Sequence, residues 1–78
     1  MNELIIRLNS VRDVEDFVAK ATGCPYPIFL DDGQHTVSGK SFMEMFCLVL
    51  TRPLRLVAQC DDESFRQLRQ NLDRFLVL

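Results

Sequence analysis

Residues 4–23, LIIRLNSVRDVEDFVAKATG, change their pattern of apolar side chains at Ser10. Before this serine, apolar and other residues alternate, as in a strand that buries one face. After it, apolar residues recur every three or four positions, which is typical of a helix that buries one face; they are Val11, Val14, Phe17, Val18 and Ala21. Ser10 with Asp13 three positions later matches a helix-start pattern, and Gly23 ends the helix. The stretch therefore predicts a strand followed directly by a helix.

The rest of the chain repeats these two patterns. Residues 31–34, DDGQ, lie between two short apolar runs and predict a hairpin. At Ser41, which has an acid three positions on, a second and more apolar helix begins and continues to residues 51–53, TRP. In residues 54–60, apolar side chains again occupy every second position, which predicts another strand. Residues 61–63, DDE, place negative charge at the start of a last, long helix, whose apolar stripe is formed by Phe65, Leu68, Leu72, Phe75 and Leu76.

The predicted order of elements is βαββαβα, within one domain of residues 1–78. Short strands cannot each hide a face alone, so one sheet with helices on one side is the simplest arrangement. A right-handed crossover sets the first two strands parallel, and the last strand fits between them. The fold class is therefore α+β, with a four-stranded antiparallel sheet, three helices on one face and an open outer face. Arg66, Arg69 and Arg74 lie away from the apolar stripe of the last helix, and we expect them to be solvated.

The composition excludes several classes of function. The chain has 78 residues and a net charge of −2, whereas nucleic-acid-binding domains are usually basic. No apolar run approaches the ~20 residues that span a bilayer, and no basic region precedes the first apolar residues, so neither a membrane span nor a signal peptide is predicted. The cysteines, Cys24, Cys47 and Cys60, lack the close spacing of zinc sites. We expect three buried, reduced thiols in a cytoplasmic protein.

No complete catalytic set is present. Nucleophilic catalysis needs a nucleophile, a base and usually an orienting group, and the single histidine, His35, lies beside the predicted hairpin turn, where a solvated strand residue is expected. The three glycines are too far apart for a phosphate-binding loop, and neither acidic cluster has the spacing of a calcium loop. We therefore expect no enzyme activity, no cofactor and no metal.

The start of the first helix is a candidate anion site. A helix N-terminus offers unpaired amides and a partial positive charge. The Arg12 guanidinium, close to Ser10 in the sequence, could add a contact to a phosphate. In the alternative interpretation, Ser10 only caps the helix and Arg12 is a solvated charge.

The segment after Ser41 is too apolar for an ordinary surface helix. Only Glu44 is polar in residues 42–50, yet a helix packed on a sheet buries one face rather than its whole circumference. Some of these side chains should therefore be exposed, and an exposed apolar patch usually marks a contact site. The candidates are Phe42, Met43 and Phe46. The alternative is that the whole segment lies in the core.

With this order of elements, the chain resembles HPr, the histidine-containing phosphocarrier family of the bacterial phosphoenolpyruvate:sugar phosphotransferase system. The resemblance runs essentially from end to end, through pieces that are weak singly and more specific together. They are Phe17-Val18 with Ala21 and Gly23, Gly39-Lys40-Ser41 before an apolar helix, Leu48-Val49-Leu50-Thr51, and Asp61-Asp62-Glu63. The implied fold is the open-faced β-sandwich of that family, in agreement with the predicted sheet.

The chain departs from the family at the residue that carries the phosphate. In the family, a histidine at the start of the first helix stands in a His-x-Arg-Pro setting; the corresponding residues here are Ser10, Val11, Arg12 and Asp13. A phosphohistidine is labile and passes its phosphoryl group on, whereas a serine phosphate is a stable ester. Asp13 also adds negative charge where the phosphate would lie. Phosphoryl transfer by the family's mechanism is therefore not expected.

The family's second site is implied to persist. Ser41 falls on the serine that a dedicated kinase phosphorylates in some members, where a phosphate would add about −1.5 to −2 charge. Phe42 and Met43 fall on positions with which the family docks to Enzyme I and to regulators. Together with Lys40 and Phe46 they form the predicted docking surface. In the alternative interpretation, Ser41 only caps its helix.

These observations favour an HPr-like protein with a regulatory or binding role in carbon metabolism, rather than a phosphocarrier. The expected partners are Enzyme I-like, sugar-permease or transcription-regulator proteins, with a kinase for Ser41 as a further candidate, and neither nucleic acid nor membrane. Two alternatives stay open: a phosphoacceptor or phosphotransferase that uses Ser10 or another residue, and an interaction module unrelated to sugar transport.

Overall fold

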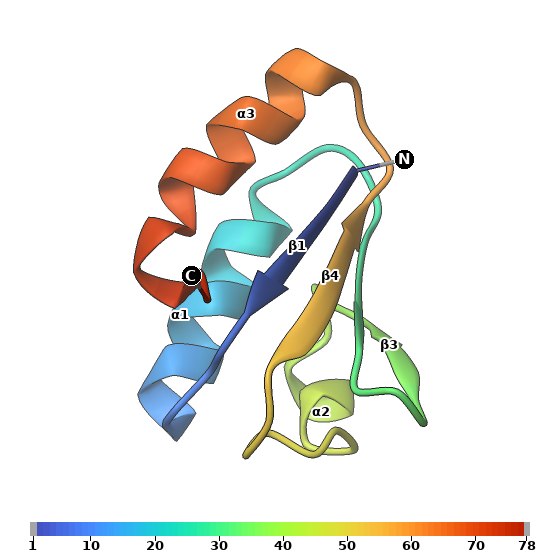
Figure 1. The fold of residues 1–78 in the computed structure, drawn as a ribbon, viewed down its shortest axis with the longest axis vertical. Helices are drawn as coiled ribbons and strands as arrows, with labels where there is room; N and C mark the ends of the chain where they lie inside the picture. Colours follow the sequence, from blue (N-terminus) through green and yellow to red (C-terminus); the bar gives the residue numbers. More distant parts are fainter. Residues whose placement is uncertain (1, 78) are drawn as a thin grey trace.

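The computed structural model describes residues 2–77 and has the predicted order of elements (Figure 1). Within these residues the elements are β1 (Asn2–Ile6), α1 (Val11–Thr22), β2 (Ile28–Asp31), β3 (Thr36–Ser38), α2 (Phe42–Met45), β4 (Leu54–Ala58), α3 (Asp62–Asn71) and a short 3₁₀ helix, η1 (Asp73–Phe75). None of the helices in this part of the chain is both long and apolar enough to cross a membrane.

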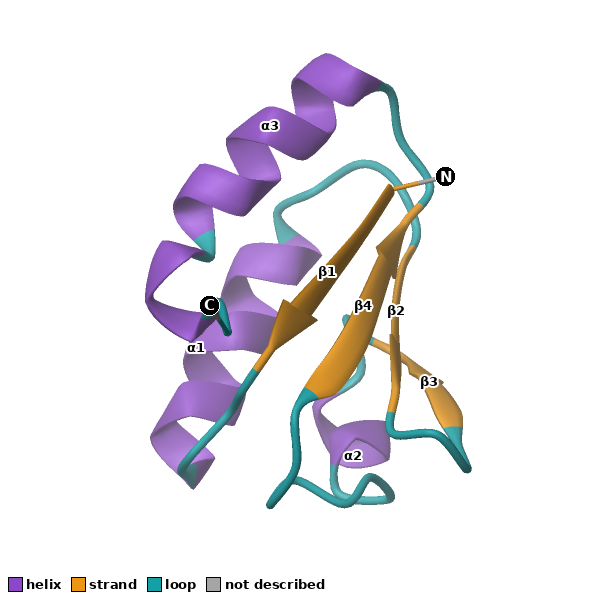
Figure 2. Cartoon of the chain, in the orientation of Figure 1, coloured by secondary structure: helices purple, strands orange, loops and turns teal. Residues whose placement is uncertain are grey.

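The four strands form one antiparallel sheet in the order β1-β4-β2-β3. The last strand therefore lies between β1 and β2, as the crossover argument predicted, and Leu56 of β4 stands opposite both Leu4 and Leu30. Figure 2 shows the helices gathered on one side of the sheet. The α+β open-faced sandwich is thus confirmed.

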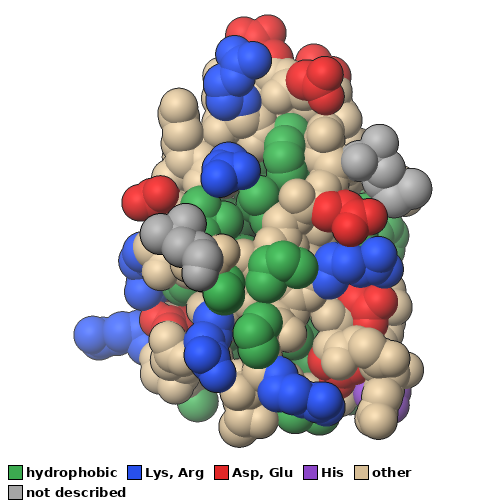
Figure 3. Space-filling view, in the orientation of Figure 1, with side chains coloured by type: hydrophobic (Ala, Val, Ile, Leu, Met, Phe, Trp, Pro, Cys, Tyr) green, Lys and Arg blue, Asp and Glu red, His purple; other side chains and the backbone are tan. Residues whose placement is uncertain are grey.

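The two faces of the sheet differ in the way that the alternating sequence predicted. Leu4 and Ile6 of β1 and the even-numbered residues of β2 and β4 point towards the helices and are buried. Phe17 of α1 and Phe75 are buried with them, and their rings meet edge to face with centroids 6.2 Å apart. Figure 3 shows the opposite, outer face, where apolar side chains over β1 and β4 are bordered by charged ones. Here Arg55 pairs with Glu3 at 3.6 Å and with Asp31 at 3.2 Å.

The second helix is shorter than predicted. α2 covers only four residues, and the next three amides, from Phe46 to Leu48, donate to carbonyls three residues back instead of four. The amide of Val49 then donates to Oδ2 of Asp32 at 2.9 Å, rather than to the carbonyl of Met45. A side chain from the hairpin turn therefore ends the helical winding.

The last helix also ends early. α3 stops at Asn71 and η1 turns the chain back towards β1. There, the backbone amide of Arg7 donates to the carbonyl of Phe75 at 2.8 Å, and the amide of Val77 donates to the carbonyl of Ile5 at 3.0 Å. Phe75 and Leu76 therefore lie beyond α3 and not on its stripe, because the C-terminal segment hydrogen-bonds along the edge of β1.

The prediction of three buried thiols is wrong. All three cysteines are free, Cys47 is exposed, and Cys24 and Cys60 are half-buried. Cys47 lies in the turns after α2, where Leu48 reaches the core and Cys47 faces the solvent.

Candidate functional site

Ser10 caps α1. Its backbone is extended, with φ −154° and ψ 167°, and its Oγ accepts the amide of Asp13 at 3.1 Å while its carbonyl accepts the amide of Val14 at 3.1 Å. This is the geometry of an N-cap, which typically contributes about 1 kcal/mol to stability. The Ser10 hydroxyl oxygen is thus already engaged in holding the helix end.

Asp13 is held by two partners rather than being exposed as an isolated charge. Its Oδ2 accepts the amide of Asn9 at 2.9 Å, and its Oδ1 accepts Nη1 of Arg74 at 2.9 Å. Nη2 of the same guanidinium lies 2.7 Å from Oδ2 of Asp16, and the guanidinium carbon lies 4.2 Å from the centroid of the Phe75 ring. The hydrogen bond from Asn9 and then the Arg74 guanidinium hold the pKa of Asp13 below its usual value.

This cluster bears on two expectations. Arg74 is exposed, as expected of a solvated residue, and it also connects the C-terminal segment to the first turns of α1 through ion pairs with Asp13 and Asp16. The charge of Asp13 is also balanced by Arg74, which weakens the argument that Asp13 would repel a phosphate at Ser10.

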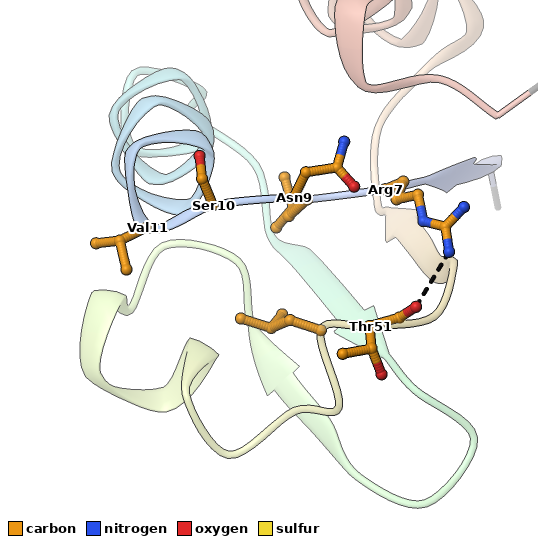
Figure 4. Close-up of a pocket in the computed structure, with 7 residues that line it drawn as sticks. Arg7, Asn9, Ser10, Val11 and Thr51 are labelled. Atoms are coloured by element: carbon orange, nitrogen blue, oxygen red, sulfur yellow. Dashed lines mark hydrogen bonds between the residues drawn. The ribbon is translucent and has the colours of Figure 1, made fainter.

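An open hollow of about 400 Å³ lies beside Ser10. It is lined by Arg7, Leu8, Asn9, Ser10, Val11, Leu50 and Thr51 (Figure 4). Nη2 of Arg7 donates to the carbonyl of Thr51 at 3.1 Å and so connects the β1–α1 loop to the loop before β4. The Ser10 hydroxyl points towards α1 and away from Thr51.

Positive charge predominates in the two segments that line this hollow. Residues 4–12 and 45–60 contain four arginines and no acidic residue. One of them, Arg55, is paired on the outer face of the sheet, whereas Arg12 and Arg52 are exposed and form no ion pair among residues 2–77. Figure 3 shows basic side chains at the end of the molecule where α1 begins. Arg12 and Arg52 each follow directly on a residue that lines the hollow, Val11 and Thr51, while the acidic Asp13 adjoins them in α1 and is paired with Arg74.

The second serine caps α2. Oγ of Ser41 accepts the amide of Glu44 at 3.3 Å, and the residue is half-buried. The adjacent Lys40 turns away, because its Nζ donates to the carbonyl of Cys24 at 2.7 Å. Lys40 was predicted to belong to the docking surface, but its ammonium is hydrogen-bonded within the protein.

The predicted exposure of the apolar segment is confirmed. The side chains of Phe42, Met43 and Phe46 are 37%, 79% and 48% exposed, and we call them the apolar face. The Phe42 and Phe46 rings meet edge to face with centroids 5.0 Å apart. α2 contacts α1, and Figure 1 shows α2 and the start of α1 at the same end of the molecule.

His35 lies in the turn of the β2–β3 hairpin, which Asp32 joins to the loop after α2. Its side chain is exposed, and its Nδ1 is 3.7 Å from Oδ2 of Asp32. The interpretation of His35 as a solvated residue agrees with this placement. Within residues 2–77, no group of three potential metal ligands comes together.

The fold has a counterpart among solved structures. The crystal structure of HPr-C-His from Thermoanaerobacter tengcongensis superposes with a TM-score of 0.74 over 94% of this chain and 92% of that chain, at 23% sequence identity. No protein-family model matches the sequence, and no curated protein matches it significantly. The comparison therefore establishes an HPr-like fold.

Proposed function

We propose that this chain is an HPr-like binding protein related to the sugar phosphotransferase system, which acts by docking to other proteins and does not carry phosphate. The observation that carries the proposal is Ser10, which stands where the resemblance places the phosphorylated histidine and whose hydroxyl is engaged as a helix cap. A phosphate on Ser10 would be a stable ester and would not be passed on readily.

The apolar face and the arginines near it support a role in docking. Contiguous exposed apolar side chains mark contact sites, and methionine adapts to partners of different shape because its side chain is flexible. Arg12 and Arg52, which form no ion pair within residues 2–77, directly follow Val11 and Thr51, which line the hollow beside Ser10. An acidic protein surface with an apolar centre is the complementary partner, because opposite charges steer association and align the two surfaces.

Phosphorylation of Ser41 would regulate this docking. The phosphate would add about −1.5 to −2 charge next to Phe42, at a surface whose partner is acidic. The ammonium of the adjacent Lys40 donates to the carbonyl of Cys24 rather than to Ser41. We therefore propose that a phosphate on Ser41 weakens the docking of acidic partners.

Incubation with phosphoenolpyruvate and a bacterial Enzyme I should leave this chain without acid-labile phosphate. An HPr that retains its histidine serves as the positive control in the same reaction. The measurement is radiolabel retained on each protein before and after mild acid. An acid-labile adduct on this chain would overturn the proposal, and an acid-stable phosphate on Ser10 that passes to an acceptor would support the phosphotransferase alternative.

Partner binding should depend on the apolar face and not on the sheet. For an aromatic anchor in an interface, Phe46→Ser should weaken binding by a factor of about 30 or more. Ile5→Ser is the matched control, because Ile5 is equally apolar and 45% exposed on the outer face of the sheet. Proteins retained from the host lysate are identified with the wild type, and their affinities are then measured for both variants and for Ser41→Asp.

Ser41→Asp should also weaken binding, with a loss that shrinks at high salt. Retention of the same partners by Phe46→Ser and Ser41→Asp with unchanged affinity would instead favour an interaction module unrelated to this surface.

A further inference from the structure

A second hollow, of about 300 Å³, lies between the α1–β2 loop and α3. One wall is a single face of α3, because its residues are spaced three or four positions apart; they are Ser64, Gln67, Leu68 and Asn71. The other wall is residues 23–26, which leave the end of α1 and pass beside α3 (Figure 1). The hollow therefore has one wall from a regular helix and one from a loop.

The loop wall is held in place by hydrogen bonds of Cys24. Its Sγ donates to the carbonyl of Lys20 at 3.5 Å, and its amide donates to the carbonyl of Ala21 at 3.1 Å. Its carbonyl accepts Nζ of Lys40 at 2.7 Å. Tyr26, two residues further on, packs against the hydrophobic core. A wall that is fixed in this way does not have to be ordered when a ligand binds, which lowers the entropic cost of binding.

The helix wall presents polar groups that are available to a ligand. The carboxamides of Gln67 and Asn71 lie one helical turn apart, are exposed, and form no hydrogen bond with residues 2–77. Each carboxamide offers two N–H donors and one carbonyl acceptor. Leu68, Pro25 and Tyr26 supply an apolar part of the same lining. A combination of apolar surface and a few hydrogen-bonding groups is typical of sites for small molecules.

The lining also limits the chemistry of the ligand. None of the described residues that line this hollow is charged, so a charged ligand would lose part of its hydration without gaining an opposite charge. A purely apolar ligand would cover the two carboxamides without replacing their hydrogen bonds to water. A neutral ligand whose groups both donate and accept hydrogen bonds avoids both costs, and the adjacent hydroxyls of a polyol are such groups. A volume of about 300 Å³ is at the small end for ligand sites, which suits a single ring.

We propose that this hollow binds a neutral polyol of the size of a monosaccharide. Gln67 and Asn71 hydrogen-bond its hydroxyl groups, and Leu68 and Tyr26 contact its C–H groups. The inference does not depend on docking at the apolar face, because Phe42, Met43 and Phe46 are not among the residues that line this hollow.

The test is a titration of the full-length, nitrogen-15-labelled protein with D-glucose and with myo-inositol, followed through the backbone amide chemical shifts. At least one of these polyols should give saturable shifts in residues 23–26 and 64–71, with a Kd on the order of 1 mM for so small a ligand. Glucuronate, which adds a carboxylate, and cyclohexanol, which keeps one hydroxyl on a ring, are the matched control ligands and should bind more weakly. The proposal is overturned if neither polyol gives saturable shifts in these residues, or if either control ligand binds as tightly as the polyols.

Variants of α3 assign the binding to the hollow. Gln67→Met keeps the length of the side chain but removes its carboxamide, so it should weaken polyol binding by about 3–10-fold. Gln70→Met is the matched control, because Gln70 is exposed on the same helix but does not line the hollow. Both variants should keep the wild-type melting temperature, since both positions are exposed. Equal affinity of the two variants for the polyol would contradict the assignment, as would shifts confined to the residues around Ser10 or the apolar face.

Discussion

Replacing Phe17 by alanine should lower the free energy of unfolding by about 3–5 kcal/mol, the usual loss when a large aromatic side chain leaves a cavity in a core. Phe17 is fully buried and lies between two parts of the chain that converge on it. Its ring meets Phe75 edge to face, and its Cε2 lies only 3.2 Å from where a side chain on Gly39 would begin. The cavity left by Phe17→Ala should stay largely open, because α1 packs against both Phe75 and the backbone at Gly39 and cannot easily shift to fill it.

Urea unfolding followed by circular dichroism measures this loss. Val11→Ala is the matched control on the same helix, because Val11 is 56% exposed and should change stability by less than about 0.5 kcal/mol. A loss below about 1.5 kcal/mol for Phe17→Ala would mean that the core around Phe75 collapses into the cavity, and that α1 is held less tightly than the contacts indicate.

The periodicity of the chain was sufficient to predict most of the fold. Alternation and helical spacing depend on neighbouring residues, so they identify the strands and helices without knowledge of the tertiary contacts. The Asp-Gly hairpin follows the same rule: Gly33 takes φ 98°, a conformation that glycine adopts readily, and its amide is bound by Asp31 at 2.7 Å. The resemblance then agreed with the arrangement of these elements in the sheet.

The lengths of α2 and α3 could not be predicted in this way. Each helix ends where a distant part of the chain forms hydrogen bonds with the residues that follow it. After α2, Asp32 accepts the amide of Val49, and after α3 the backbone of β1 and Arg7 bonds to the segment around Phe75. Both interactions join residues that are far apart in the sequence, so no local sequence pattern predicts them. The apolar composition after Ser41 predicted exposure correctly, although the exposed residues lie on a short helix and its following turns rather than on a long helix.

The candidate site was predicted in part, for the same reason. Ser10 as a cap follows from residues 10–13 alone, and the structure places Ser10 Oγ on the amide of Asp13. The pairing of Asp13 with Arg74 spans 61 positions and depends on the turn of η1, which the helical stripe did not indicate.

Asp32 should be the residue on which acid stability depends most. Its enclosed carboxylate accepts three backbone amides: those of Gln34 at 2.8 Å and His35 at 2.7 Å on Oδ1, and that of Val49 at 2.9 Å on Oδ2. The hydrogen bond from Val49 first, and then those from the turn, hold the pKa of Asp32 far below its ordinary value of 3.8. Asp32 thereby connects the hairpin turn to the loop that follows the apolar face.

The sign of the pH effect follows from this lowered pKa. Only the ionised carboxylate accepts all three amides fully, so its contribution is complete above about pH 4 and is lost as the pH falls through the lower, folded-state pKa. In that acid range the unfolded chain takes up about one proton more than the folded chain at this site. Asp32→Asn should therefore be less stable than the wild type at pH 7, and its stability should fall less steeply between about pH 4 and pH 2.

Urea midpoints measured across this pH range test the expectation. The number of protons linked to unfolding should be smaller by about one in Asp32→Asn than in the wild type. Glu15→Gln, which removes an exposed carboxyl group from α1, should keep the steep wild-type dependence. Equal slopes for Asp32→Asn and the wild type would mean that other carboxylates with lowered pKa values, those of Asp13, Asp16 and Asp61, account for the acid sensitivity. The loop after α2 would then be held by its apolar contacts, with Met45 and Leu48 in the core, rather than by Asp32.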